Sequence, residues 1–260
     1  MTSSPRFEGK HVVVTGAGTG IGRAIAIRLA DEGARLTLFA RDAVRLGDTA
    51  AKLPASAKAH VASLDIRDRA AVDGCFAAAA EHHGPIFGLV ANAGIGGENR
   101  PGPEDRFDDL IATNLTGTYN CVRAAERHLE QGPEARHLLI VASILARLGV
   151  PGYTGYCASK AGLVGLARSL AAELAPQNIQ VNAVLPGWVD TEMARQGIQG
   201  MAEGMGVTYD QAYEMAMSAV PMHRMSRAED IAGMVAWLLS PDARGVTGQG
   251  LDMNGGAFMI

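Results

Sequence analysis

Cysteines, aromatic side chains and surplus charge are all scarce in this sequence. The three cysteines, Cys75, Cys121 and Cys157, are scattered and show no metal-ligand spacing, so we expect reduced thiols and no metal site. Aromatic residues make up only 5% of the chain against 48% for all hydrophobic residues, so the interior must rely on small and aliphatic side chains. The net charge is −4 and no basic cluster appears, which argues against a nucleic-acid partner and against an anionic membrane surface.

Long apolar stretches are missing as well. No run of about 18 or more apolar residues occurs, so we expect no membrane-spanning helix. Residues 1–10 are polar and contain no apolar segment of the kind found in secretory signal peptides. We therefore expect a cytoplasmic protein whose partners are small molecules. Its 260 residues are enough for one α/β domain with a large buried core.

A glycine-rich turn follows the first apolar run of the chain. Residues 11–15 have the pattern of a short strand and residues 23–32 that of an amphipathic helix, so the glycines join a strand to a helix. This layout presents backbone N–H groups and a helix N-terminus to a phosphate group. Such a turn can be purely structural, but its place after the first strand favours a dinucleotide site. The candidate cofactor-binding residues of the turn are Gly16, Gly18, Thr19, Gly20, Ile21 and Gly22.

Strand and helix patterns then alternate along the rest of the chain. Helical patterns cover residues 68–83, 107–130 and 154–174, and no linker, repeat or low-complexity segment separates them. The sequence therefore predicts an α/β fold, a single doubly wound Rossmann-type parallel sheet of about seven strands with helices on both faces. One domain is expected to span residues 1–260. The further predicted strands lie at 35–39, 58–63, 86–91, 136–142, 180–185 and 251–253.

The residues after the second strand indicate which nucleotide is bound. An acidic residue about 20 positions after the glycine turn binds the ribose 2′-hydroxyl of NAD, whereas an arginine nearby suits the 2′-phosphate of NADP. Here the strand ends in Ala40, and Arg41 follows. We therefore predict NADP(H). The alternative is NAD(H), with Asp42 reaching back to the ribose and Arg41 solvated.

Tyr156 and Lys160 lie four residues apart in the helical run 154–174, so both side chains are expected on one helix face. A tyrosine with a pKa of about 10 is a poor acid or base at neutral pH, and a neighbouring cation favours its phenolate. We therefore expect Lys160 to lower the pKa of Tyr156. A single such pair can be structural, but Ser143, at the end of a predicted strand thirteen residues before the tyrosine, favours a proton-transfer site.

Residues 191–221 break the alternation of strands and helices and are rich in methionine. The segment follows the predicted strand at 180–185, beside the proposed site. Flexible thioether side chains adapt to apolar ligands, so we predict a mobile lid over an apolar substrate. A plain core contribution is the alternative. The methionines of this segment are Met193, Met201, Met205, Met215 and Met217.

Taken together, these motifs resemble the short-chain dehydrogenase/reductase family over nearly the whole chain. The sequence departs from the family pattern at Ala91, where a second asparagine is common, but Asn92 still matches. Each motif is weak alone, and their common order and spacing carry the resemblance. The matching residues are Thr15, Gly16, Gly20, Gly22, Asn92, Ala93, Gly94, Asn114, Ser143, Tyr156, Lys160, Pro186, Gly187 and Thr191.

The resemblance implies a role for each matching position. Tyr156 would be the general acid in ketone reduction, Lys160 would lower its pKa and hold the nicotinamide ribose, and Ser143 would hydrogen-bond the substrate oxygen. Asn114 would support a water-linked proton route to Lys160. Further cofactor contacts are implied at Asp65, Ile66, Asn92, Ala93, Gly94, Pro186, Gly187, Val189 and Thr191. The implied substrate-binding residues are Ser143, Leu145, Tyr153, Tyr156, Trp188 and Met193.

Within the family, residues 187–193 and 220–224 resemble 3-oxoacyl reductases and aromatic polyketide ketoreductases. The resemblance implies NADP(H)-dependent reduction of a 3-keto group and a homo-oligomer, either dimer or tetramer. Residues 175–178 lack the surface arginines of reductases that act on carrier-bound thioesters, which leaves carrier-protein docking open. One alternative is an NAD-dependent dehydrogenase that oxidises a secondary alcohol. A remote alternative is a nucleotide-binding protein without catalysis.

Overall fold

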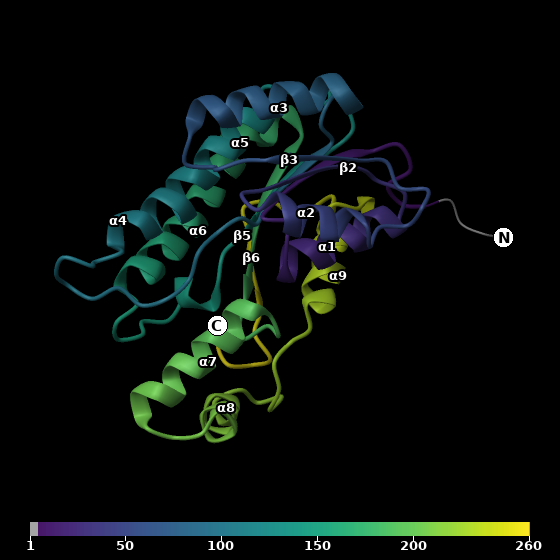
Figure 1. Ribbon diagram of the computed structural model, residues 1–260. Helices are drawn as coiled ribbons and strands as arrows, with labels where there is room; N and C mark the ends of the chain where they lie inside the picture. Colours follow the sequence, from purple (N-terminus) through teal and green to yellow (C-terminus); the bar gives the residue numbers. More distant parts are fainter. Residues whose placement is uncertain (1–4, 260) are drawn as a thin grey trace.

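Seven parallel strands form the central sheet of the computed structural model, which describes residues 5–259 (Figure 1). Their order across the sheet is β3-β2-β1-β4-β5-β6-β7. The chain starts in the middle, moves outward to β3 and then crosses back to β4, so the direction of winding reverses between β1 and β4. The predicted doubly wound fold is confirmed. The strands are β1 (His11–Thr15), β2 (Arg35–Ala40), β3 (Ala59–Ser63), β4 (Gly88–Ala91), β5 (Arg136–Val141), β6 (Ile179–Pro186) and β7 (Gly250–Met253).

Helices cover both faces of the sheet. In Figure 1, α3, α5 and α6 lie on one side of the strands and α1 and α9 on the other. These layers are built from α1 (Gly20–Asp31), α2 (Ala43–Ala50), α3 (Arg69–His83), α4 (Phe107–Leu110), the π-helix η1 (Ile111–Gly117), α5 (Thr118–Glu126), α6 (Thr154–Leu174) and α9 (Ala228–Leu238). Three short 3₁₀ turns complete the connections, η2 (Ile144–Ala146), η3 (Ala175–Gln177) and η4 (Pro241–Ala243).

Each face of the sheet has its own hydrophobic core. Strand side chains alternate between faces, so Val13 joins the core under α3, α5 and α6, whereas Val12 and Val14 join the core under α1 and α9. Aromatic contacts are few, as the composition predicts, and Phe39 packs on Phe76 with ring centroids 5.4 Å apart.

The structure differs from the predicted elements mainly between residues 107 and 130. The predicted single helix is divided into α4, η1 and α5, and α5 ends at Glu126. Residues 128–130 leave the helix because they pair with Ile86, whose N–H donates to the oxygen of His128 at 2.8 Å and whose oxygen accepts from Glu130 N at 2.9 Å. Ile86 is therefore an isolated bridge before β4. The sequence patterns also missed α2 and α9.

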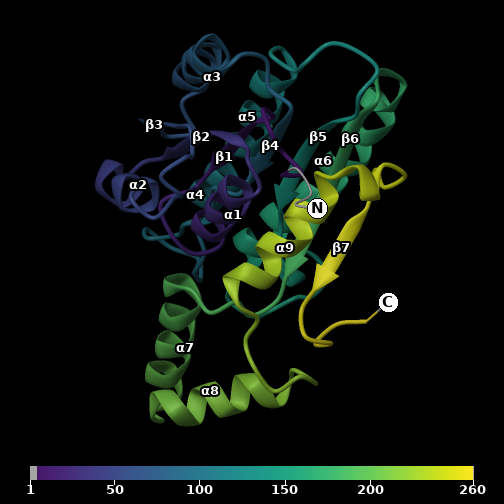
Figure 2. The same cartoon turned by 90° about the vertical axis from the view of Figure 1, so that its right-hand side faces the viewer.

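Residues 191–221 break the alternation of strands and helices, as predicted, and they also leave the layered arrangement. They form α7 (Glu192–Met205) and α8 (Tyr209–Ser218), which project beyond the carboxyl ends of the strands (Figure 2). Their apolar sides share a small separate core that includes Ile198, Ala212 and Met217. Within residues 5–259, none of the helices is both long and apolar enough to cross a membrane.

Candidate active site

The glycine-rich turn lies at the carboxyl end of β1, pressed against the end of β4. Gly16 has φ +66°, and a Cβ atom there would come 2.7 Å from Ala93 Cα. Thr15 Oγ1 accepts hydrogen bonds from Asn92 N at 3.1 Å and Ala93 N at 3.0 Å, while Asn92 Nδ2 donates to the oxygens of Thr15 and Gly16. Asn92 and Ala93 therefore fix the backbone of the turn.

The N-terminus of α1 is open to a ligand. Its N-cap residue, Thr19, makes no side-chain capping bond, so the first N–H groups of the helix have no side-chain partner there. A Cβ atom at Gly20 would meet Thr191 Cγ2 at 3.1 Å, which places the turn beside the start of α7. A cavity of about 370 Å³ opens here, lined in part by Thr19, Gly20 and Thr191. Bare N–H groups at a helix N-terminus fit the pyrophosphate of a dinucleotide.

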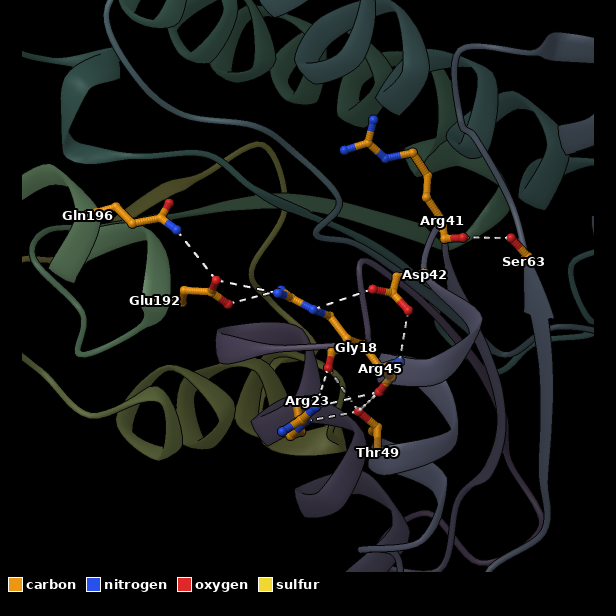
Figure 3. Close-up of polar contacts among 9 residues, drawn as sticks. All are labelled: Gly18, Arg23, Arg41, Asp42, Arg45, Thr49, Ser63, Glu192 and Gln196. Atoms are coloured by element: carbon orange, nitrogen blue, oxygen red, sulfur yellow. Dashed lines mark hydrogen bonds and ion pairs between the residues drawn. The ribbon is translucent and has the colours of Figure 1, made fainter.

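Arg41 and Asp42 follow β2, at the predicted adenosine end of the site (Figure 3). The Asp42 carboxylate caps α2 by accepting from Arg45 N at 3.0 Å, and it also pairs with Arg45 Nε at 3.4 Å. The Arg41 guanidinium, in contrast, makes no hydrogen bond or ion pair within residues 5–259 and points away from these contacts in Figure 3. The guanidinium of Arg41 is free to contact a phosphate, whereas the carboxylate of Asp42 is already engaged and is less available to a ribose hydroxyl.

Arg45 is a site-bordering residue that the sequence analysis missed. Its guanidinium donates to both carboxylate oxygens of Glu192, at 2.9 and 3.4 Å, and so connects α2 to the first turn of α7 across the glycine turn (Figure 3). The capping role of Asp42 is visible in the sequence because its partner is three residues away. Glu192 lies 147 residues from Arg45, and no local pattern connects the two.

Asp65 and Ile66, the expected adenine contacts, are engaged with other parts of the protein. Asp65 pairs with Arg67 at 2.6 Å, and this contact holds the pKa of the carboxyl below its usual range. Ile66 is only 5% exposed, and a Cβ atom at Gly117 would come 2.6 Å from its side chain. The Ile66 side chain is therefore packed against η1, while Asp65 stays at the surface beside Arg67.

Ser143, Tyr156 and Lys160 come together at the carboxyl end of β5. Tyr156 and Lys160 share one face of α6, with Lys160 Nζ 5.7 Å from the tyrosine ring centroid. Lys160 is 5% exposed, and its Nζ donates to the oxygen of Val141 at 3.0 Å. Burial lowers the pKa of Lys160 to about 8. Tyr156 and Lys160 thus share a helix face, as their spacing predicts, and Lys160 reaches the end of β5 two residues before Ser143.

The expected lowering of the tyrosine pKa does not occur in this arrangement. Burial raises the pKa of Tyr156, and a hydrogen bond with Ser143 offsets only part of that shift. Lys160 Nζ lies 5.7 Å from the ring centroid of Tyr156 and donates to the oxygen of Val141, and the desolvation of the phenol is the largest influence on its pKa. Tyr156 is consequently a neutral phenol at pH 7, the form that can donate a proton.

Asn114 lies inside the π-helix η1 and is completely buried. Its Oδ1 accepts from Ile95 N at 2.8 Å, and its Nδ2 donates to the oxygen of Ile95 at 3.0 Å and to Ser159 Oγ at 3.1 Å. A Cβ atom at Gly94 would come 3.1 Å from Asn114 Oδ1 and 3.5 Å from Lys160 Nζ. A wider helical turn at this point suits a functional residue, and Asn114 joins the strand end to α6 beside Lys160.

The loop after β6 carries the predicted nicotinamide contacts. Gly187 N donates to the oxygen of Met253 at 2.9 Å, and a Cβ atom there would come 2.8 Å from Asn254 Cα, so the residue after Pro186 must be small. Val189 is buried and forms a bridge with Ser226. Thr191 caps α7 through Oγ1. These contacts hold the loop rigidly between β6 and the predicted lid.

The predicted substrate residues fall into two groups. The backbone N–H of Leu145 donates to Ser143 Oγ at 3.2 Å. Met193 is 48% exposed, and its sulfur would lie 3.0 Å from a Cβ atom added at Gly96. Tyr153 is the N-cap residue of α6, near Tyr156. Trp188 instead faces α7, with its ring 3.5 Å from a Cβ position at Gly197. Trp188 therefore supports the predicted lid from behind.

A second cavity, of about 540 Å³, is not lined by the catalytic candidates. It lies behind the predicted lid, where Arg195 pairs with Asp190 and Arg224 pairs with Asp230 at 3.7 Å. Its arginines are thus partly neutralised by carboxylates. Within residues 5–259, no group of three or more His, Cys, Asp or Glu side chains could hold a metal ion.

Comparison with known proteins agrees with this arrangement. A family model described as enoyl-(acyl carrier protein) reductase matches residues 16–257. The 3-oxoacyl-(acyl-carrier-protein) reductase MabA of Mycobacterium tuberculosis (strain ATCC 25618 / H37Rv) is 33% identical over 259 residues, which cover 99% of this chain and 96% of the relative. The 3-oxoacyl-(acyl-carrier-protein) reductase FabG of Escherichia coli (strain K12) is 33% identical over 256 residues, or 98% of this chain and 99% of the relative.

Among solved structures, a variant of actinorhodin polyketide ketoreductase with NADPH superposes with a TM-score of 0.89 at 34% identity, covering 95% of this chain and 97% of the other. The family match and the relatives both extend over nearly all of the sequence. The chain therefore belongs to the short-chain dehydrogenase/reductase family of oxidoreductases, which act on C=O and CH–OH groups.

Proposed function

We propose that this protein is an NADP(H)-dependent reductase that converts a ketone to a secondary alcohol, with Tyr156 as general acid. The observation that carries the proposal is the group formed by Ser143, Tyr156 and Lys160 beside the open glycine turn. Burial raises the pKa of Tyr156 and keeps it protonated at neutral pH, which favours proton donation over proton abstraction.

A nicotinamide nucleotide bound at the glycine turn would supply the hydride. The residues of this chain place the carbonyl and deliver the proton. Ser143 donates a hydrogen bond to the carbonyl oxygen, where negative charge develops, and Tyr156 transfers its hydroxyl proton to that oxygen. The ammonium of Lys160 stabilises the phenolate that Tyr156 becomes. Asn114, beside Lys160, supports a water-linked route that returns the proton.

NADP(H) is favoured over NAD(H) by the two residues after β2. Arg41 is exposed and has a free guanidinium, while Asp42 is already used as the cap of α2. A guanidinium suits a phosphate through charge-assisted hydrogen bonds. The similar ketoreductase structure contains NADPH, which agrees with this assignment.

Titration of NADPH and NADH fluorescence with the wild-type protein and Arg41→Ala tests the cofactor. We expect NADPH to bind the wild type at least tenfold tighter than NADH, about 1.4 kcal/mol, and Arg41→Ala to remove most of that difference. Arg127→Ala is the matched control, because Arg127, directly after α5, pairs with Asp73 of α3, away from the glycine turn. Tighter NADH binding would instead support oxidation of a secondary alcohol, and binding of neither nucleotide would contradict the proposed oxidoreductase.

The proposed substrate is an apolar ketone of the 3-oxoacyl or polyketide type. Residues 191–221 are proposed as its lid, because Met193 reaches over the catalytic end of the site and α7 and α8 pack as a unit separate from the main cores. Two relatives are named as reductases of 3-oxoacyl groups on an acyl carrier protein, and one similar structure is a polyketide ketoreductase. The turn over residues 175–178 offers no arginine, so we propose a substrate that needs no carrier docking there.

A homo-oligomer, dimer or tetramer, is also proposed from the family resemblance. Light scattering coupled to gel filtration measures the molar mass directly. A mass of one chain, 27.1 kDa, would contradict this part of the proposal.

A further inference from the structure

The helix that carries Tyr156 and Lys160 begins without a capping side chain of its own. Its N-cap residue is Tyr153, which makes no side-chain capping bond. The first N–H groups of a helix have no partner within the helix and need one from outside. Tyr156 lies in this first turn, so the place of its hydroxyl depends on how firmly the turn is held.

We propose that Asn99, on the loop between β4 and α4, is a positioning residue that caps α6 from outside and so holds Tyr156 against Ser143. The inference rests on the proposed function for the identity of the proton donor. Asn99 Oδ1 accepts a hydrogen bond from Gly155 N at 2.8 Å, and Gly155 is the residue directly before Tyr156. No other side-chain hydrogen bond to the first N–H groups of α6 occurs within residues 5–259.

Asn99 is built into its place by further contacts. Its side chain is 6% exposed, and its Nδ2 donates to Asp105 Oδ1 at 3.1 Å and to Thr154 Oγ1 at 3.0 Å. Its own backbone N–H donates to the oxygen of Gly152 at 2.8 Å. These partners fix the orientation of the amide, because Gly155 N can only donate and the Asp105 carboxylate can only accept.

The loop that carries Asn99 also borders the substrate side of the site. It includes Ile95, which Asn114 holds by both backbone groups, and Gly96, which lies against Met193 of α7. Arg106 Nη1 closes the loop by donating to the oxygen of Gly96 at 3.3 Å. Asn99 thus connects the substrate-side loop to the proton donor.

The second anchor of α6 at the site is independent of Asn99. Lys160 Nζ donates to Val141 one turn further along the helix. Loss of the Asn99 cap should therefore loosen Tyr156 and leave Lys160, and hence nucleotide binding, in place. This separation distinguishes a positioning role from a general loss of structure.

Asn99→Ala tests the proposal directly. We expect kcat for ketone reduction to fall about 10- to 100-fold, because misplacement of a reacting group by about 1 Å has effects of this size. NADPH affinity should change by less than about twofold, since no cofactor contact is touched. Asn182→Ala is the matched control, because Asn182 is also buried (2% exposed) and its amide joins β6 to two backbone groups of the loop before β7, Val246 O and Gln249 N.

A second substitution that restores the hydrogen bond tests whether kcat depends on this particular contact. Asn99→Asp keeps an acceptor for Gly155 N. It also places a second carboxylate next to Asp105, whose Oδ1 lies 3.1 Å from the amide nitrogen that is replaced, so the two carboxylates repel each other. We expect Asn99→Asp to lose activity at pH 7 and Asp105→Asn, added to it, to recover at least about a third of the wild-type kcat, because the second change restores a donor opposite the new carboxylate.

Hydrogen exchange at Gly155 N–H reads the cap without any turnover. Faster exchange in Asn99→Ala than in Asn182→Ala, with the loss of kcat, would support the proposal. Unchanged exchange at Gly155, an unchanged kcat in Asn99→Ala, or an equal loss of kcat in Asn182→Ala would each overturn it. A wild-type protein that reduces no ketone would contradict the proposed function, and the exchange comparison would still decide whether Asn99 caps α6.

Discussion

The two edges of the parallel sheet both bury titratable side chains, and they do so with different consequences. At the carboxyl edge, burial raises the pKa of Tyr156 and lowers the pKa of Lys160 to about 8. At the opposite edge, burial lowers the pKa values of His11 and His137 to about 4. The same physical effect, removal of a charge from water, therefore acts at both ends of the strands.

What separates the two edges is the set of neighbours around each buried group. His11 is saturated, with one ring nitrogen on Gly84 O at 2.8 Å and the other on Thr37 Oγ1 at 3.0 Å. His137 stacks edge-on against Phe87, with ring centroids 5.0 Å apart. At the carboxyl edge, Tyr156 is instead only partly shielded from solvent, and its hydroxyl interacts with the side chain of Ser143. Burial supports chemistry only where a bound molecule can exchange a proton with the buried group.

The largest expected effect is that of removing the proton donor from the carboxyl edge. Tyr156→Phe should lower kcat for ketone reduction by about a thousandfold, within the range for loss of a general acid. The thermal midpoint should stay close to wild type, because only one hydroxyl is lost. Steady-state kinetics with saturating NADPH, together with calorimetry, measures both.

Tyr119→Phe is the matched control for this variant. Tyr119 lies on α5 against the guanidinium of Arg123, which is 5.6 Å from its ring centroid, and it has no part in the candidate site. It should keep wild-type turnover. Undiminished turnover in Tyr156→Phe would remove Tyr156 from the mechanism and with it the functional difference between the two edges.

How far the sequence alone predicted these features depends on how local each one is. The strand ends, the glycine turn and the spacing of Tyr156 and Lys160 depend on neighbours within a few residues, and the structure places them as expected. The π-helix around Asn114 was not predicted, and the partners of Asn114, Ile95 and Ser159, lie 19 and 45 residues away, so no local pattern reveals these contacts. Asn99 was missed for the same reason, because its partner Gly155 is 56 residues away.

The direction of the tyrosine pKa shift was wrong for a related reason. Sequence spacing gives the separation of Tyr156 and Lys160 along the helix, but it does not give their burial. In the structure, Lys160 donates to the oxygen of Val141, a group supplied by β5, and desolvation is the largest influence on the pKa of Tyr156 and raises it. Charge balance in a buried site is a property of the packed fold.

The next largest effect is a loss of folding stability at acidic pH. It arises at the edge opposite the carboxyl ends of the strands, where His11 and His137 lie. The pKa values of His11 and His137 are lowered from 6.5 to about 4 in the fold. Between pH 6.5 and 4 the unfolded chain therefore binds protons that the folded protein does not, so stability falls as the pH falls through this window. Each histidine contributes up to about 3 kcal/mol to this loss. Urea unfolding at a series of pH values measures it.

His137→Leu makes the origin of this loss testable. The Nδ1 atom of His137 is buried without a hydrogen-bond partner within residues 5–259, so a leucine of similar volume should be tolerated. The variant should lose less stability than the wild type between pH 6.5 and 4, whereas His223→Asn, at an exposed position, should follow the wild type. A wild-type slope in His137→Leu would show that this histidine is not a source of acid sensitivity.

The smallest expected effect is a loss of kcat at alkaline pH, which arises at the carboxyl edge of the sheet. The pKa of Lys160 is about 8, so its ammonium is progressively lost above that pH, and with it the stabilisation of the Tyr156 phenolate. We expect kcat to fall about twofold by pH 8 and by up to about tenfold by pH 9, as the charged fraction of Lys160 decreases. Folding stability should not fall in parallel, because a lysine whose pKa is lowered in the fold favours the folded state as the pH rises from 8 towards 10.5. A kcat that stays constant to pH 9.5, or one that falls only as the protein unfolds, would contradict the role of the Lys160 charge.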